Sequence, residues 1–200
     1  MVLLTGGSGL LGRNLQKLME VNAPSHELLN IVKSVKAFDC DMVVHCAAYT
    51  NVTKAETERR ECFNVNVYGT LNLLEIYKDK PFVYISSEYA HKPVNFYALT
   101  KSLAEQLVMA HPNYLIIRTL FKPRPWVYPK AFVDQYTCGD YVNIIAPMIA
   151  EEIKKWDRQS KTIYIGTGRK TIFDLARETR DVEPMSVDDI KDVKLPKDYL

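Results

Sequence analysis

The sequence lacks the features that mark membrane, secreted or metal-bound proteins. No stretch approaches the ~18 consecutive apolar residues of a membrane-spanning helix, and no charged and apolar leader stands before the apolar run that begins at residue 1. The cysteines show no paired spacing, so we expect reduced thiols and not a disulfide framework or zinc site. The four histidines are scattered, and no metal is expected. These absences predict a cytoplasmic protein without a membrane partner.

The chain also lacks a charge excess of either sign. Its 26 Lys and Arg nearly balance 24 Asp and Glu, which argues against nucleic acid as a partner. Apolar residues make up 47% and charged residues 25% of the 200 residues, typical of globular proteins. A chain of this length buries one core, or one core with a small lobe.

Short buried runs alternate with helical patterns through the first 120 residues. We predict strands at 1–5, 41–48, 82–86 and 114–118, a strand stub within 20–25, and helices at 10–19 and 96–110. A helix or strand stub is expected at 27–36, and a long helix is expected before Pro81. This alternation predicts the α/β class: a doubly wound parallel sheet, the Rossmann fold.

The composition changes after Leu120, where residues 122–130 read KPRPWVYPK. We therefore predict a dinucleotide-binding Rossmann domain at 1–120 and a reduced C-terminal substrate-binding lobe at 121–200. The lobe partly returns to the Rossmann core, with a helix at 146–156, a strand at 162–165 and a helix at 173–180.

Glycines recur every three residues between the first predicted strand and helix, at Gly6, Gly9 and Gly12. Backbone without side chains can approach a pyrophosphate closely, and a helix N-terminus favours its charge. The loop therefore predicts NAD or NADP binding. The sequence does not decide between NAD and NADP. Glu27 is an uncertain ligand for the adenosine ribose, and Arg13 is an equally uncertain ligand for the 2′-phosphate of NADP.

A tyrosine and a lysine lie one helical turn apart, at Tyr97 and Lys101. A nearby cation favours the phenolate, so we expect Lys101 to lower the pKa of Tyr97 toward a useful acid–base range. Ser87 closes the preceding strand, at the sheet edge where ligands bind. These three residues are the predicted catalytic group, and Glu88 and Tyr89 are candidate substrate contacts.

The proline-rich segment after Leu120 supplies cations and an aromatic face, which a nucleotide diphosphate needs. The candidate substrate contacts there are Lys122, Arg124 and Trp126, with Lys130 nearby. Further possible contacts at the mouth of the site are Thr50, Asn51 and Lys54.

Six segments occur in an order that resembles the extended short-chain dehydrogenase/reductase family, and within it the dTDP-4-dehydrorhamnose reductase group. They are TGGSGLLGRNL, HCAAYTNVTKAE, NVNVYGTLNLLE, YISSEYA, YALTKSLAE and IIRT. Later echoes are DYVNIIAPMIAEEI, IYIGTGRKTIFDLARET and the final LPKDYL. The resemblance implies a catalytic role for Ser87, Tyr97 and Lys101, and a cofactor site that includes these last two with Gly6, Ser8, Gly9, Leu10, Leu11, Gly12, Cys46, Ala47, Ala48, Tyr49 and Asn66.

The resemblance favours reduction of a 4-keto nucleotide sugar by NADPH or NADH. Related 4,6-dehydratases carry an Asp-Glu pair after the catalytic Ser or Thr, whereas Ser87 is followed by Glu88 and Tyr89. An NAD-dependent epimerase and a non-catalytic dinucleotide-binding regulatory module remain alternatives. The partners implied are a nucleotide sugar and, as a possibility, a second copy in a homodimer.

Overall fold

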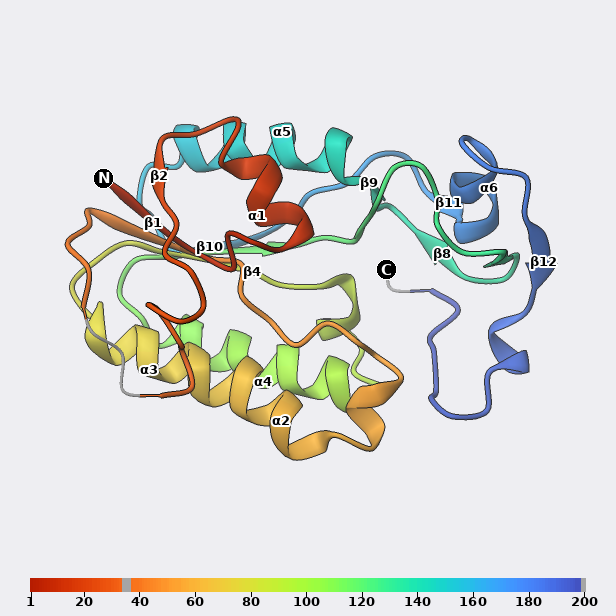
Figure 1. Cartoon of the computed structure of the whole chain (residues 1–200), viewed down its shortest axis with the longest axis horizontal. Coiled ribbons are helices and arrows are strands. Elements are labelled where there is room, and N and C mark those ends of the chain that lie inside the picture. The colour runs from red at the N-terminus through yellow and green to blue at the C-terminus, as the bar shows by residue number, and fades with distance from the viewer. Residues whose placement is uncertain (34–36, 199–200) are drawn as a thin grey trace.

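A six-stranded parallel sheet forms the centre of the protein, in a computed structural model that describes residues 1–33 and 37–198. Its order is β10-β5-β4-β3-β1-β2 (Figure 1). The strands are β1 (Val2–Thr5), β2 (Val21–Asn22), β3 (Met42–His45), β4 (Phe82–Ile85), β5 (Tyr114–Arg118) and β10 (Lys161–Tyr164). Every residue of β3 and β4 is buried, as expected for central strands covered on both faces.

The strand order reverses beside β1. The chain first steps from β1 to β2 and then returns to the other side of β1 for β3, with Leu4 paired to Val44. Later strands continue outward from β3. Such a switch point leaves a crevice at the carboxyl ends of the two diverging strands, where ligands of open α/β sheets bind.

Helices cover both faces of the sheet (Figure 1). On one face lie α1 (Leu10–Leu15) and α5 (Val142–Lys155); on the other lie α2 (Arg59–Phe63), α3 (Gly69–Ile76) and α4 (Phe96–Met109). Because side chains alternate along a strand, Leu4 packs in the core under α1 and α5 while its neighbour Leu3 packs in the core under α3 and α4. Residues 64–68 form a π-helical turn that joins α2 to α3.

A small lobe lies beyond the carboxyl end of the sheet (Figure 1). Short strands pair in it two by two: β6 (Phe121–Lys122) with β9 (Asp140–Tyr141), β7 (Lys130–Phe132) with β12 (Glu183–Met185), and β8 (Tyr136–Thr137) with β11 (Lys170–Thr171). Together with α6 (Ile172–Arg177) they enclose a separate apolar core that includes Trp126, Tyr141 and Leu175. Single 3-10 turns lie at Lys54–Glu56, Glu88–Ala90 and Val187–Asp189.

The predicted fold class is confirmed, and most predicted elements lie within a few residues of their expected bounds. The helix expected at 27–36 is wrong for 27–33, which form turns; residues 34–36, and Tyr199 and Leu200 of the final motif, lie outside the described residues. Asn30 Oδ1 accepts a hydrogen bond from the backbone N–H of Val32 at 3.0 Å, a local bond that competes with a helical one.

β10, which follows residue 120 in the sequence, pairs with β5 in the central sheet. The division into domains at residue 120 stays a prediction. In the described ranges, no helix has both the length and the apolar character needed to cross a bilayer.

Candidate active site

A cleft of about 620 Å³ opens at the switch point between β1 and β3. One wall is the loop from β1 into α1, and the opposite wall is the segment that follows β3. Of the residues predicted to bind a dinucleotide, the cleft is lined by Gly6, Ser8, Gly9, Leu10, Leu11, Gly12, Cys46, Ala47, Ala48 and Tyr49. The geometry thus brings together two segments that are about 40 residues apart in the sequence.

Two of the three glycines in the loop are fixed by close backbone contacts. Gly6 has a φ of 72°, and a Cβ on it would lie 2.6 Å from the backbone N of Ala47. A Cβ on Gly12 would lie 2.2 Å from the carbonyl oxygen of Gly6. Gly9 precedes α1, and no side chain caps the helix there. The glycines therefore let the loop pack closely on the segment after β3 and on its own backbone, in a turn before a helix start that fits the approach of a phosphate.

Asn66 holds the segment after β3 in place. Its side-chain oxygen accepts from the backbone N–H of Tyr49 at 2.8 Å, and its Nδ2 donates to Thr100 Oγ1 at 2.9 Å and to the carbonyl of Tyr49 at 3.2 Å. Asn66 is buried within the π-helical turn, a local geometry often associated with functional sites. It acts on the cleft through this backbone, since it does not line the cleft itself.

Ser87 and Tyr97 meet at the end of β4. Ser87 begins the 3-10 turn Glu88–Ala90, and its hydroxyl accepts from the backbone N–H of Tyr89 at 3.2 Å. Burial raises the pKa of Tyr97 well above its ordinary value of 10, while its hydrogen bond with Ser87 acts in the opposite direction. The phenol therefore keeps its proton, which is the state a proton donor needs.

The predicted effect of Lys101 on this phenol is wrong in direction, because the pKa of Tyr97 is raised and Lys101 is not among the causes of its shift. The Lys101 ammonium points instead to the end of β4, where Nζ donates to the carbonyl of Ile85 at 2.9 Å and lies 4.2 Å from the centre of the Tyr84 ring. Burial lowers the pKa of Lys101 to about 7. Spacing of one helical turn put the two side chains on one face but could not report how deeply both are buried.

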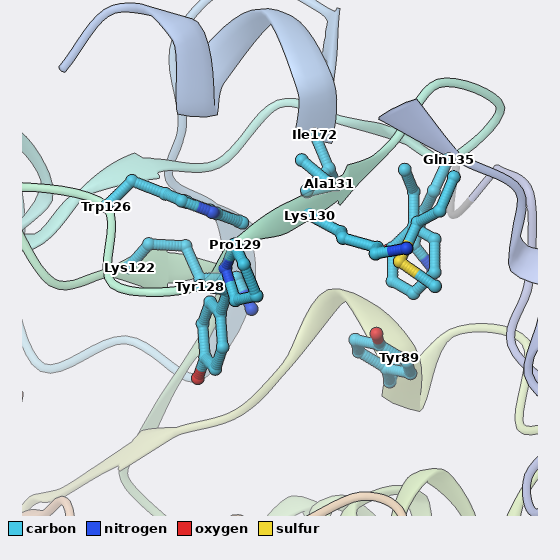
Figure 2. A pocket seen from close by; sticks show the side chains of 11 residues that line it. Tyr89, Lys122, Trp126, Tyr128, Pro129, Lys130, Ala131, Gln135 and Ile172 are labelled. Atoms are coloured by element: carbon cyan, nitrogen blue, oxygen red, sulfur yellow. The ribbon is translucent and has the colours of Figure 1, made fainter. Parts of the chain in front are cut away.

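Tyr89 joins this group to a second hollow in the small lobe. Its ring lies edge to face with that of Tyr97, with centres 6.0 Å apart. Tyr89 also lines a pocket of about 420 Å³, in which Figure 2 shows it across from Trp126 and Tyr128. The other lining residues are Lys122, Pro129, Lys130, Ala131, Phe132, Gln135, Ile172 and Met185. Lys122 and Tyr128 also line the cleft between β1 and β3, so the cleft and the pocket share a wall.

Comparison with known proteins decides the family at this point. A sequence profile described as the RmlD substrate binding domain matches residues 1–133. The chain belongs to this RmlD family. The resemblance found in the sequence motifs is thereby confirmed.

Relatives of this RmlD-family chain include sugar-nucleotide enzymes. It is 31% identical over 156 residues to the dTDP-4-dehydrorhamnose reductase of Mycolicibacterium smegmatis, covering 64% of this chain and 46% of the relative. A dTDP-4-dehydrorhamnose reductase from Bacillus anthracis, solved in complex with NADP, aligns with a TM-score of 0.84 at 24% identity over 99% of this chain and 88% of that one. MoeE5, solved with UDP-glucuronic acid and NAD, aligns with a TM-score of 0.72 at 19% identity, covering 92% and 85%.

The RmlD-family chain spans about half the length of the curated relatives it matches, with 46% and 54% of the first two covered. The alignments with solved structures show a shared fold. What those proteins bind or convert therefore bears on this chain only as a proposal.

Several predicted contacts are not where the sequence suggested. Glu88 is 2% exposed and faces the lobe, where its Oε2 accepts from Thr137 Oγ1 at 2.7 Å and its carboxylate accepts from the backbone of residues 138 and 139. Arg124 is exposed and lies over the ring of Tyr141, outside the pocket. Glu88 is thus part of the junction between sheet and lobe and does not line the pocket in the lobe.

Some of the residues predicted at the mouth of the cleft line it, and others do not. Thr50 lines the cleft, whereas Asn51 and Lys54 do not. Neither Glu27 nor Arg13 lines it, and His26 does. Within residues 1–33 and 37–198, no three His, Cys, Asp or Glu side chains gather as a metal site would require.

Sequence reasoning missed most of the pocket in this RmlD-family chain. Tyr128 lay inside the proline-rich motif and carried the same aromatic signal as Trp126. Phe132 and Met185 come from the paired strands β7 and β12, and Gln135 precedes β8; the sequence revealed none of these strands. Ile172 begins α6, one residue before the helix that the sequence predicted. No local pattern marks them, because only the folding of the lobe brings them together.

Proposed function

We propose that this protein reduces the 4-keto group of a nucleotide sugar with NADPH or NADH. The observation that carries the proposal is the adjacency of three features: a glycine-lined cleft, a pocket that shares a wall with it, and a serine–tyrosine pair touching the pocket through Tyr89. A ketone held in the pocket lies between a proton donor and a site suited to a dinucleotide.

Each residue of the pair has a separate task in this proposal. The Ser87 hydroxyl donates a hydrogen bond to the carbonyl oxygen of the ketone and so orients it. Tyr97 gives its proton to the same oxygen as negative charge develops there. Burial of both side chains excludes water from this transfer.

The cleft is the proposed site of the dinucleotide. The glycine loop and the uncapped start of α1 suit its phosphates. In this proposal Lys101, whose ammonium lies at the end of β4, holds the nicotinamide ribose. When bound in reduced form, the dinucleotide supplies the hydride. NADP and NAD both stay open, since the solved relatives include complexes with each.

Glu88 favours reduction over dehydration. Elimination needs an acid–base pair beside the catalytic serine, but the Glu88 carboxylate is buried against Thr137 and the backbone of the lobe. A nucleotide-sugar epimerase and a regulatory dinucleotide-binding module stay as alternatives. A cytoplasmic location and a homodimer stay predictions that accompany the proposal.

The test is Tyr97→Phe, assayed by the loss of reduced-nicotinamide absorbance with a panel of 4-keto nucleotide sugars. Turnover should fall by about a hundredfold or more, and dinucleotide affinity should change less than about threefold. Tyr68→Phe, at an exposed tyrosine that ends the π-helical turn, is the matched control and should keep full turnover. Retained turnover in Tyr97→Phe would remove the phenol from the chemistry. Absence of any turnover in the wild type, with cofactor bound, would favour the regulatory module.

A further inference from the structure

Lys122 is a half-buried cation on the wall between the two hollows. It lies in β6 and lines both the cleft and the lobe pocket. Among the described residues, no carboxylate lies within ion-pair distance of its ammonium; its near neighbours are the rings of Trp126 and Tyr128, 5.9 and 6.0 Å away. Desolvation lowers the pKa of Lys122. A cation that is partly withdrawn from water and makes no ion pair carries a cost in free energy unless another group compensates it.

Trp126 supplies a second donor without a partner in the same wall. The side chain is 4% exposed, and its Nε1 has no hydrogen-bond acceptor in the part of the chain that the structure describes. The fold satisfies a similar indole elsewhere, where Trp156 Nε1 donates to the carbonyl of Gln159 at 2.7 Å. Buried donors in native proteins are nearly always satisfied, so the Trp126 N–H points to an acceptor that the chain itself does not provide.

The pocket contains a contrasting lysine. Lys130 also lines it, but its side chain is 53% exposed and its ammonium lies 3.1 Å from Glu183. Figure 2 shows Lys122 beneath the indole of Trp126 on one side of the pocket, with the Lys130 ammonium on the far side. Lys122 is therefore the less exposed of these two cations and lacks an ion pair such as the one Lys130 makes.

We propose that Lys122 and Trp126 form an anion subsite that holds the diphosphate of the nucleotide-sugar substrate, an inference that rests on the proposed function. A diphosphate offers several acceptor oxygens and negative charge, which together satisfy an ammonium and an adjacent N–H donor. The subsite adjoins Tyr128 and shares the pocket with Tyr89, which contacts Tyr97. A diphosphate held there leaves the attached sugar on the side of Tyr89 and Ser87.

The test measures binding of thymidine diphosphate and uridine diphosphate by calorimetry, with thymidine and uridine as ligands that lack the anion. Lys122→Met should weaken diphosphate binding by about tenfold or more, the effect of removing a hydrogen bond to a charged group, and change nucleoside binding less than twofold. Lys130→Met removes the same charge from the exposed, paired position and should change diphosphate binding less than threefold.

A second variant tests the indole. Trp126→Phe keeps an aromatic ring and removes the donor, so diphosphate affinity should fall by about threefold to tenfold while nucleoside affinity and the thermal midpoint hold. The inference is overturned if Lys122→Met binds diphosphate as the wild type does, or if Lys130→Met loses as much. It is also overturned if the wild type binds no nucleoside diphosphate.

A parallel titration with NADP shows whether Lys122 binds the phosphates of the dinucleotide or the diphosphate of the nucleotide. A loss confined to NADP assigns Lys122 to the cleft and overturns the inference. Failure of the two proposals is distinguishable, because binding needs no turnover. A wild type that binds diphosphate through Lys122 yet reduces no keto sugar retains the subsite and contradicts the proposed reaction.

Discussion

Replacing Lys101 with methionine should stabilise the protein while removing its proposed activity. The side chain is 2% exposed, and burial lowers its pKa from 10.5 to about 7, a shift that Glu105 and two cysteines only partly oppose. At ~1.4 kcal/mol per pH unit between these values, burying the charged form costs up to about 5 kcal/mol. The hydrogen bond to Ile85 is worth about 1 kcal/mol, so we expect a net gain of about 2–4 kcal/mol.

The gain should depend on pH in a defined direction. Below pH 7 both the folded and the unfolded chain carry the Lys101 charge, and the full cost is present. Between pH 7 and 10.5 the unfolded chain holds a proton that the folded chain has released, so wild-type stability rises with pH. The advantage of the methionine variant should therefore be largest near pH 6 and shrink toward pH 10.

Urea unfolding of both proteins at several pH values measures this difference. Lys78→Met, a change at an exposed site after α3, is the matched control and should stay within about 0.5 kcal/mol of the wild type at every pH. A Lys101→Met protein that is less stable than the wild type at pH 6 would refute the reasoning. So would a difference that does not narrow with rising pH. Turnover of Lys101→Met should fall by about a hundredfold, measured with reduced nicotinamide.

Three further changes address the cleft and the junction with the lobe. Gly12→Ala should lower the thermal midpoint and dinucleotide affinity, since its Cβ would lie 2.2 Å from a carbonyl oxygen; Gly168→Ala, with nothing within 4 Å, is the control. Glu88→Gln should leave the KM for substrate unchanged, whereas Glu88→Ala should cost about 1–3 kcal/mol in urea unfolding because its donors lose their acceptor. Asn66→Leu should weaken dinucleotide binding, measured by fluorescence, because both hydrogen bonds to the backbone after β3 are lost; unchanged affinity would contradict that support.

The sheet could be predicted because its strands are short runs buried on both faces. β5 has the bounds expected for it, and β4 ends one residue before its expected end. Such runs carry their own signal, since apolar residues fill all of β4 and all of β5 but its last position, whichever strand lies beside them. The glycine loop could also be predicted, because close backbone contacts leave no space for a side chain at Gly6 or Gly12.

The small lobe could not be predicted in the same way. Its strands are two or three residues long, too short to show alternation. The pairing of β7 with β12 joins segments about 50 residues apart, so it depends on the folding of the whole lobe. The pocket in the lobe could not be predicted for the same reason, because residues such as Gln135 and Met185 come to line it only when these strands pair.

The buried Lys101 and the half-buried Lys122 differ from the Arg118 side chain in how their charges are compensated. Arg118 is paired with Glu105 at 2.6 Å, and Glu105 also accepts from Ser86, so this network satisfies itself. Lys101 has a carbonyl and a ring beside it and a longer-range attraction to Glu105, and Lys122 has two rings beside it. A fold selected for stability alone would gain by placing apolar side chains at both positions. Lys122 instead lines both hollows, and Lys101 lies near Cys46, which lines the cleft. In the two proposals a bound ribose and a bound diphosphate supply partners to these ammonium groups. Two lysines without a direct ion pair beside neighbouring hollows therefore favour a protein that binds two ligands side by side.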